Sequence, residues 1–301
     1  MYKFDAPQVR RFDSLASFFQ TISDGLVTRN HDYGFRGHTC SSWTLETTLM
    51  RYIKQTNSTW NMLKADMSSS AQKVVARRLR SNLKKNLIVN RDFPQEFVEN
   101  TDLWQLGQHF GLPSPLLDWS YSPYVALFFA LNSPSTSEAA RCVWKINLEM
   151  LEHLNREIQE HIYPKKSESL SESLLEDQFP KAPIIGDENA FNQRIAFQQG
   201  FFIKVQYYEN LETWLKRITP ELAQDSADRP TLEKFEFYCS ESERLEYLDI
   251  LDKMNINYRT LFPDVFGSVQ DAIDSTTRSF TAPSTRSYSF GKSEESLLRK
   301  N

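Results

Sequence analysis

Two short groups of polar residues, separated by a loop with two prolines, stand out as candidates for chemistry. Gln108 and His109 precede the loop, and Asp118, Trp119 and Ser120 follow it. An imidazole and a carboxylate can move protons, an amide can hold a hydroxyl group, and an indole can stack on a flat ring. The spacing allows these side chains to meet in one site, although an ordinary loop before a core helix gives the same pattern.

A buried helix directly after this loop would hold the polar groups in place. Ser122 can cap such a helix, because its hydroxyl can accept from first-turn amides, and Pro123 suits the first helical position. Residues 124–131 are apolar around the whole helical circumference, which predicts burial on all sides. A loop attached to such a helix is well suited to fix reactive side chains.

Residues 108–130 resemble the signature of the FRG-domain family, which is named after an upstream Phe-Arg-Gly. That tripeptide stands at residues 35–37, and two later motifs, at residues 194–202 and 261–264, follow in the family's order. Four motifs in order are more specific than any one of them. At residues 114–115 the chain departs from the pattern, because Ser-Pro replaces the usual Thr-Arg and removes a cation.

The motif order is also similar to that of ADP-ribosyltransferases of the Arg-Ser-Glu type, which consume NAD. Residues 35–37, 117–120 and 126–130 are similar to the first strand, second strand and helix of that pattern. Gln198 stands where the catalytic glutamate would be, and Asp118 stands for the first serine. The resemblance implies an α+β fold with an ADP-ribosyltransferase-like split mixed sheet and surrounding helices.

The resemblance also implies roles for individual side chains. Arg36 is suited to the diphosphate of NAD, because its planar guanidinium can donate two parallel hydrogen bonds. Gln198 could hold a ribose hydroxyl but has no usable pKa, so a general base would come from Asp118, His109 or Glu188. The candidate catalytic residues are Arg36, His109, Asp118 and Gln198. The candidate cofactor-binding residues are Arg36, Gly37, Trp119, Ser120, Tyr124 and Phe129.

The two arginines in these motifs also have structural interpretations. Arg36 could form an ion pair with a carboxylate such as Glu46, since a cation in a short strand needs a partner. Arg194 could pair with Asp118 without contacting a ligand.

Two further candidates have equally plain alternatives. Gln198 could be a satisfied amide at the end of a strand, and His109 could be a buried histidine that orients the Pro113 loop. A different class of enzyme, a hydrolase or nuclease, could use Asp118 together with His109. The sequence shows no cluster with metal-ligand spacing, so we expect no metal site.

A basic stretch forms a second candidate region. Residues 60–89 have a helical pattern, and no acidic residue occurs between Asp66 and Asp92. Such a basic face is either a solvated helix surface or a surface that contacts a phosphate backbone. Its cations are Lys73, Arg77, Arg78, Arg80, Lys84, Lys85 and Arg91.

The composition is that of a globular chain of one large or two small domains. It has 301 residues, 40% hydrophobic and 13% aromatic residues, and a net charge of −4 that is too small to indicate a partner. Three cysteines without metal-ligand spacing favour reduced thiols. We expect neither a signal peptide nor a membrane span, and hence a cytoplasmic protein.

Short strands interspersed with helices are expected around the motifs. In chain order we expect a helix at residues 14–22, strands at 33–38 and 141–148, a helix at 149–162, strand character across 191–208, a strand at 235–239 and a helix at 243–254. Residues 1–273 would form one domain, with 164–188 as a surface insertion. Residues 274–301 are expected to be a flexible Ser/Thr-rich tail, disordered in isolation or ordered on contact with a partner.

The resemblance therefore implies a NAD-dependent ADP-ribosyltransferase of the kind expected for a bacterial toxin or a phage-defence effector. The basic stretch suggests a nucleic acid, RNA in particular, as the acceptor, and a toxin implies a neutralising antitoxin-type protein. The alternative from another class is a catalytically silent FRG recognition module that binds a nucleotide or an RNA.

Overall fold

The computed structural model describes nine segments of the chain, and the statements below refer to these. They are residues 7–26, 32–57, 69–89, 95–100, 102–134, 140–166, 180–186, 193–218 and 230–281.

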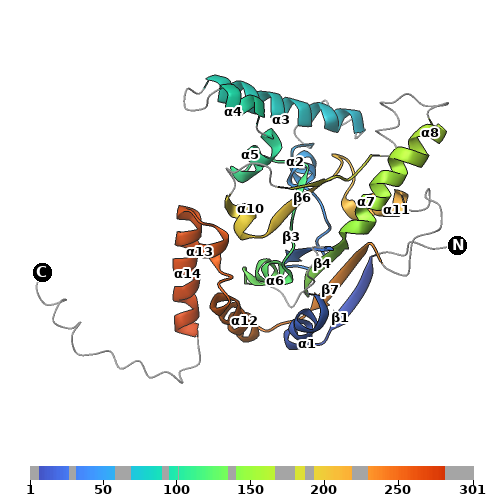
Figure 1. Ribbon diagram of the computed structural model, residues 1–301. Coiled ribbons are helices and arrows are strands. Elements are labelled where there is room, and N and C mark those ends of the chain that lie inside the picture. The colour runs from blue at the N-terminus through green and yellow to red at the C-terminus, as the bar shows by residue number, and fades with distance from the viewer. Residues whose placement is uncertain are drawn as a thin grey trace, which may run out of the picture.

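A seven-stranded mixed sheet runs through the molecule in the order β1-β7-β4-β2-β3-β6-β5 (Figure 1). The strands are β1 (Gln8–Phe12), β2 (Tyr33–His38), β3 (Leu116–Ser120), β4 (Arg141–Asn147), β5 (Ile184–Ile185), β6 (Gly200–Lys204) and β7 (Leu232–Phe237). Strand β1 pairs with β7 in parallel, and all other neighbours are antiparallel. The predicted α+β class is confirmed.

Helices cover both faces of this sheet. They are α1 (Leu15–Thr21), α2 (Thr48–Asn57), α3 (Ser69–Val89), α4 (Gln95–Asn100), α5 (Leu103–His109), α6 (Pro123–Leu131), α7 (Leu148–Glu157), α8 (Tyr163–Lys166), α10 (Gln193–Phe197), α11 (Leu211–Ile218), α12 (Glu241–Lys253), α13 (Tyr258–Leu261) and α14 (Val265–Thr281), with π-helical turns η1 (Ile22–Leu26) and η2 (Ile158–Ile162). None of the described helices is long and apolar enough to cross a bilayer.

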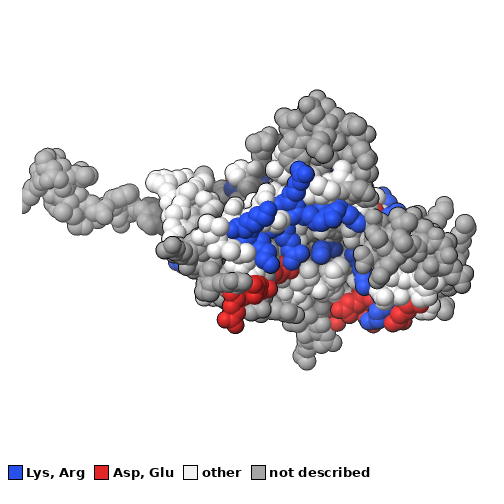
Figure 2. All heavy atoms as spheres, turned by 90° about the horizontal axis from the view of Figure 1, so that it is seen from above, with Lys and Arg blue, Asp and Glu red and all other residues white. Residues whose placement is uncertain are grey.

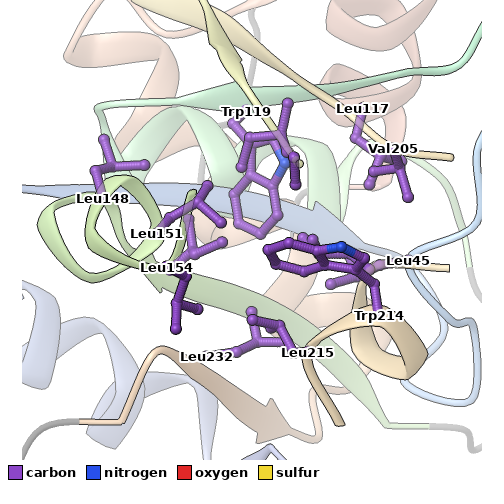
Figure 3. Packing of buried hydrophobic residues seen from close by; sticks show 14 of the residues in the cluster. Leu45, Leu117, Trp119, Leu148, Leu151, Leu154, Val205, Trp214, Leu215 and Leu232 are labelled. Atoms are coloured by element: carbon purple, nitrogen blue, oxygen red, sulfur yellow. The ribbon is translucent and has the colours of Figure 1, made fainter. Parts of the chain in front are cut away.

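The buried side chains form three clusters. One lies between the sheet and α7 with α11, where Trp119 and Trp214 pack among leucines (Figure 3). The second joins α1, α6 and α12 to the sheet, and the third joins α2, α3 and α5 to β3 and β6. The sheet is therefore buried on both faces, and the site described below lies where the second and third clusters meet.

Helix α6 is the buried helix that the sequence predicts. The Ser122 hydroxyl accepts from the Val125 amide at 3.3 Å, and Pro123 lies in the first turn. The helix packs directly on β2, because a Cβ at Gly37 would lie 1.9 Å from the Ala126 carbonyl oxygen. Only glycine fits that position, so the glycine of the Phe-Arg-Gly motif sets the distance between helix and strand.

The strand character expected across residues 191–208 is wrong in its first half. Residues 193–197 form the short helix α10, which places Ile195 in the third cluster, and β6 begins only at Gly200. Two turn residues separate them, and one of these, Gln199, has a φ of 47°. The burial of Ile195 by α10 outweighs the local strand preference of this segment.

Part of the expected surface insertion belongs to the sheet. Strand β5 pairs with β6, and the Asn155 side chain makes hydrogen bonds of 2.8 and 3.0 Å with the backbone of Ala182, which is buried. Residues 180–186 are thus fixed by backbone pairing. Residues 164–166 belong to α8, and residues 167–179 and 187–188 of the predicted insertion lie outside the described segments.

The expected flexible tail begins too early. Helix α14 continues to Thr281, so residues 274–281 are helical. The reason is an ion-pair cluster around the buried Arg278, which a search for apolar periodicity cannot detect. Residues 282–301 lie outside the described segments.

Candidate functional site

Strand β2 is paired along one edge and open along the other. Toward β4 it is paired from Tyr33↔Asn147 to His38↔Cys142, whereas toward β3 the single pair is Phe35↔Ser120. Beyond that pair the two strands diverge, and a cavity of about 420 Å³ opens beside them. The lost pairing leaves backbone groups of β3 to be satisfied by side chains.

Arg36 lies in this opening. Its Nη1 donates to the Asp118 carbonyl oxygen at 2.5 Å and lies 3.5 Å from the Asp118 carboxylate oxygen Oδ2. The expected ion pair with a carboxylate is therefore present, but its partner is Asp118 and not Glu46, which binds Lys54. Burial lowers the pKa of the Arg36 guanidinium, and the Asp118 carboxylate opposes this shift. Among the described residues, Nη2 has no protein acceptor, so it is available to an anion.

His38 orients Arg36 from the same strand and was not among the expected site residues. Arg36 Nε lies 3.2 Å from His38 Nε2, and Trp144 Nε1 lies 3.3 Å from His38 Nδ1. Burial, and next the charge of Arg36, lowers the pKa of His38 to about 3. A neutral imidazole has one N–H, and with that hydrogen on Nδ1 the ring accepts from Arg36 at Nε2. A second proton, on Nε2, would place an N–H against the Arg36 donor. The imidazole is therefore neutral and can accept from Arg36.

Asp118 is held at the cavity mouth by two side chains. Its Oδ1 accepts from Gln108 Nε2 at 2.6 Å, and its Oδ2 lies beside Arg36. Gln108 is oriented in turn by the buried Ser114, whose hydroxyl donates to Gln108 Oε1. The Asp118 side chain is nevertheless 60% exposed, so it is accessible to a ligand. Ser114, where the chain departs from the family pattern, thus acts on Asp118 through Gln108.

Gln198 lies in the turn between α10 and β6, close to the end of β3. Its side-chain Nε2 donates to the Leu261 backbone carbonyl at 3.0 Å, and its backbone carbonyl oxygen accepts from Ser120 Oγ at 2.7 Å. Strand character was expected at this residue, but Gln198 lies in a turn before β6 begins. The amide is fixed through its nitrogen, which leaves the oxygen Oε1 as the acceptor for a ligand.

Arg194 connects the third motif to the fourth. It forms an ion pair with Asp264, with Nε at 2.9 Å from Oδ2, so the expected pairing with Asp118 is wrong. The Gly267 amide, and next Arg194, lowers the pKa of Asp264. The guanidinium also lies 5.3 Å from the ring centre of Phe262, which lines the cavity.

The aromatic groups at the cavity differ from those expected. Trp119 is 3% exposed and points to the opposite face of the sheet from Asp118, into the first core cluster (Figure 3). Tyr124 contacts Ser23, with 3.3 Å between the hydroxyl groups, and does not line the cavity. Trp119 is among the residues that line the cavity, but its ring packs in the core cluster, and Tyr124 is not among them. Phe129 does line the cavity, together with Trp43 and Phe262, which were not among the expected site residues.

His109, at the end of α5, and Gly37 both line the cavity, but only His109 has a side chain to contribute. Its ring is half-buried, with its centre 4.7 Å from that of Phe110. Glu188, the remaining base candidate, lies outside the described residues. In the described part of the chain, no group of three or more His, Cys, Asp and Glu side chains is placed to hold a metal ion.

The basic stretch lies on α3, away from the cavity lining. Arg77, Arg78, Arg80, Lys84 and Lys85 are exposed there, and Lys73 is half-buried. Figure 2, which looks down on α3, shows Lys and Arg side chains gathered in a band over this part of the surface. Arg91 lies outside the described residues.

Comparison with known families agrees with the first two motifs. Residues 31–139 match the family model of the FRG domain. This segment is an FRG domain. It supplies Arg36, Asp118 and α6, whereas Gln198 and Phe262 follow the matched residues, so the FRG domain and the later chain build the cavity together. No curated protein and no solved structure matches the chain significantly.

Proposed function

We propose that this FRG-domain protein is a NAD-dependent ADP-ribosyltransferase that binds NAD in the cavity beside β2. The observation that supports this most directly is the position of Arg36 in the opening between β2 and β3. One side of its guanidinium is fixed by Asp118 and His38, and Nη2 is available. A fixed guanidinium is well suited to a diphosphate, because its geometry is set before the ligand arrives.

The other cavity groups fit the rest of NAD. Phe129 and Phe262, with ring centres 6.1 Å apart, offer apolar surfaces to the nicotinamide ring, and Trp43 stands at the exposed mouth. Gln198 Oε1 can accept a hydrogen bond from a ribose hydroxyl. The cavity volume is within the range usual for small-molecule sites, about 300–1,000 Å³.

Transfer would break the bond between ribose C1′ and the nicotinamide nitrogen. The bonding electrons leave with nicotinamide, and positive charge develops on the ribose, as in glycoside hydrolysis. The exposed Asp118 carboxylate can stabilise that charge. A lone pair of the acceptor then forms the new bond to C1′, and its proton passes to Asp118 or His109, because the neutral amide of Gln198 cannot take it.

A nucleic acid is the acceptor class that we propose, RNA in particular, on the basis of the exposed cations of α3. Binding should weaken with salt by roughly 0.9 log units per log of salt for each duplex phosphate contacted, and by about 0.7 for single strands. Replacing Arg77, Arg78 and Arg80 by glutamine should flatten that slope. An unchanged slope would leave α3 as a solvated face.

The test of the activity is incubation of the full chain with NAD labelled in the ADP-ribose part, together with RNA, DNA and protein from a lysate. Label should enter one acceptor class while nicotinamide is released. Arg36→Lys should lose both signals, whereas Arg11→Lys, a matched change at an exposed arginine on β1, should keep them. Absence of NAD consumption and NAD binding under all conditions would refute the proposal.

The second candidate is a recognition module that binds a nucleotide without consuming it. It is favoured by one observation, the fixed amide of Gln198 at the position where the resemblance places a catalytic carboxylate. Binding of NAD without release of nicotinamide would support it.

If the chain is instead an active toxin, a neutralising antitoxin-type protein is required, and the exposed cavity mouth is the surface we propose for its docking.

A further inference from the structure

Helix α14 is amphipathic in the reverse of the usual sense. Surface helices of globular proteins normally bury their apolar side and expose their polar side. Here Arg278 is 7% exposed, whereas Ile273 is 56% and Phe280 is 86% exposed. The helix thus turns its charges toward the body of the protein and its apolar side chains toward solvent.

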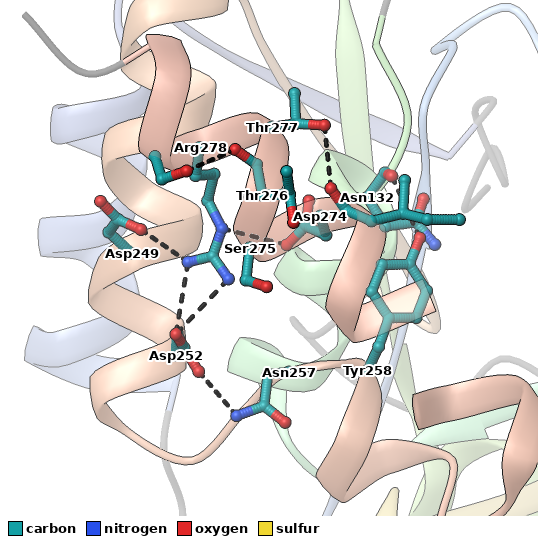
Figure 4. Close-up of polar contacts among 12 residues, drawn as sticks. Asn132, Asp249, Asp252, Asn257, Tyr258, Asp274, Ser275, Thr276, Thr277 and Arg278 are labelled. Carbon is teal, nitrogen blue, oxygen red and sulfur yellow. Dashed lines mark hydrogen bonds and ion pairs between the residues drawn. The ribbon is translucent and has the colours of Figure 1, made fainter. Parts of the chain in front are cut away.

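The inward side is fixed by ion pairs and by close packing. Arg278 Nη1 lies 2.6 Å from Asp249 Oδ1 and 3.4 Å from Asp252 Oδ2 on α12, and its Nε lies 3.0 Å from Asp274 Oδ2 (Figure 4). At the first turn, a Cβ on Gly267 would lie 1.8 Å from a backbone oxygen of the preceding turn. Rotating the helix to bury its apolar side would break these ion pairs and leave Arg278 unpaired.

The outward side has the spacing of a helix-pairing surface. Steps of three and four residues alternate along it, which places its side chains on one seam every 3.5 residues. The seam consists of Phe266, Val269, Ile273, Thr276 and Phe280. A seam with this period is covered best by another α-helix, whose side chains fit between those of α14.

The charge pattern favours an identical helix. The positions that flank the seam, Gln270, Ala272, Thr277 and Ser279, are uncharged, so two copies of α14 bring no like charges together. A single patch that is complementary to itself is what a two-fold contact requires. We infer that α14 pairs with α14 of a second copy of this chain, an association that does not depend on the proposed NAD chemistry.

Ile273 is the centre of this contact. It lies seven residues from Phe266 and seven from Phe280. A symmetric pair therefore brings the two Ile273 side chains together whether the helices run parallel or antiparallel. The seam also begins at the cavity rim, because the ring centre of Phe266 is 5.4 Å from that of Phe262.

The first experiment is sedimentation of the full chain over a concentration range. A contact of this small size should dissociate in the micromolar range, so ~1 to ~100 µM is suitable. The wild type should change from one chain to two as concentration rises, and Ile273→Glu should remain a single chain throughout. Ser275→Glu is the matched control, because Ser275 is exposed on the same helix but outside the seam. It should associate as the wild type does.

The second experiment mixes two variants. Ile273→Glu and Ile273→Lys should each remain single chains, whereas their mixture should form a pair, because opposite charges meet at the centre of the contact. A wild type that stays a single chain at every concentration would overturn the inference, as would Ile273→Glu associating like the wild type. Either result would leave the seam to a different protein or to the chain after residue 281.

Discussion

The two edges of strand β2 differ in their pairing, and this difference separates structural residues from a candidate ligand-binding residue. Along the β4 edge every residue of the strand is paired, whereas along the β3 edge the pairing stops after Phe35↔Ser120. The three residues of the Phe-Arg-Gly motif follow the same division. Phe35 is buried in the core and Gly37 contacts α6, whereas Arg36 brings a charged side chain to the opening. A short motif can thus combine two structural positions with one that meets a ligand.

The largest expected effect follows from closing the space between β2 and α6. Gly37→Ala would place a Cβ 1.9 Å from the Ala126 oxygen and 2.6 Å from the Ala130 nitrogen, both of them backbone atoms that cannot turn aside. We expect a loss of roughly 3 kcal/mol or more in the free energy of unfolding. Urea denaturation measures it, with Gly25→Ala as the control, since its Cβ would meet nothing within 4 Å. Equal midpoints for the two variants would contradict the packing described.

Arg36→Lys should have the reverse balance of effects to Gly37→Ala, with a large loss of activity and a small loss of stability. The charge remains but the second N–H group for the diphosphate is lost, so transfer should fall by about two orders of magnitude. The free energy of unfolding should change by only ~1 kcal/mol, because the core is untouched. Activity assays and urea denaturation of the same preparation separate the two effects. A variant as unstable as it is inactive would make Arg36 a structural ion-pair residue.

Gln198→Ala tests the proposed role of a second cavity residue, the binding of a ribose hydroxyl by Gln198. If Oε1 holds a ribose hydroxyl, transfer and NAD hydrolysis should fall together by roughly tenfold, the value of one hydrogen bond. Asp118→Asn should instead reduce transfer more than NAD binding, because it removes charge at the reacting ribose. Full transferase activity in Gln198→Ala would show that the similarity to transferases fails at this turn.

The most gradual expected effect concerns His38, because it develops only as the pH is lowered. Its pKa is lowered to about 3 in the folded chain, against about 6.5 when unfolded. Between these values the unfolded chain binds the additional proton, so stability should decrease as pH falls below about 6.5, by up to ~1.4 kcal/mol per pH unit. Urea midpoints across this range should show the slope. His38→Gln should reduce it, and His161→Gln, at an exposed position, should not.

Features set by neighbouring residues could be predicted from the sequence. Strand β2 has the expected bounds, and α6 has the expected cap and burial, because capping and all-round apolar character are local signals. The partner of Arg36 could not be predicted in this way. It is the backbone of Asp118, which is reached only because β2 and β3 diverge, and no pattern within either strand shows that divergence.

Trp119 and the tail show two other limits. Trp119 adjoins Asp118 in sequence, but alternation along β3 points the two to opposite faces, so proximity in sequence was the wrong criterion. The seam of α14 was present in the sequence at Phe266, Val269 and Ile273, and the high Ser/Thr content of the later residues obscured it. The burial of Arg278 on the other side of α14 depends on its ion pair with α12 and is not a local property of the sequence.

The pairing of β1 with β7 has a consequence for the order in which the protein can assemble. Gln8 opposes Glu233 in this parallel pair, so β1 can pair with β7 only after the next 225 residues have been synthesised. The cavity also needs residues that are distant in sequence, since both Arg36 and Phe262 line it. Contacts so distant in sequence form slowly. A nascent chain released before α13 would contain the FRG segment but not Phe262. Its cavity would therefore be incomplete until the chain beyond α13 had been synthesised.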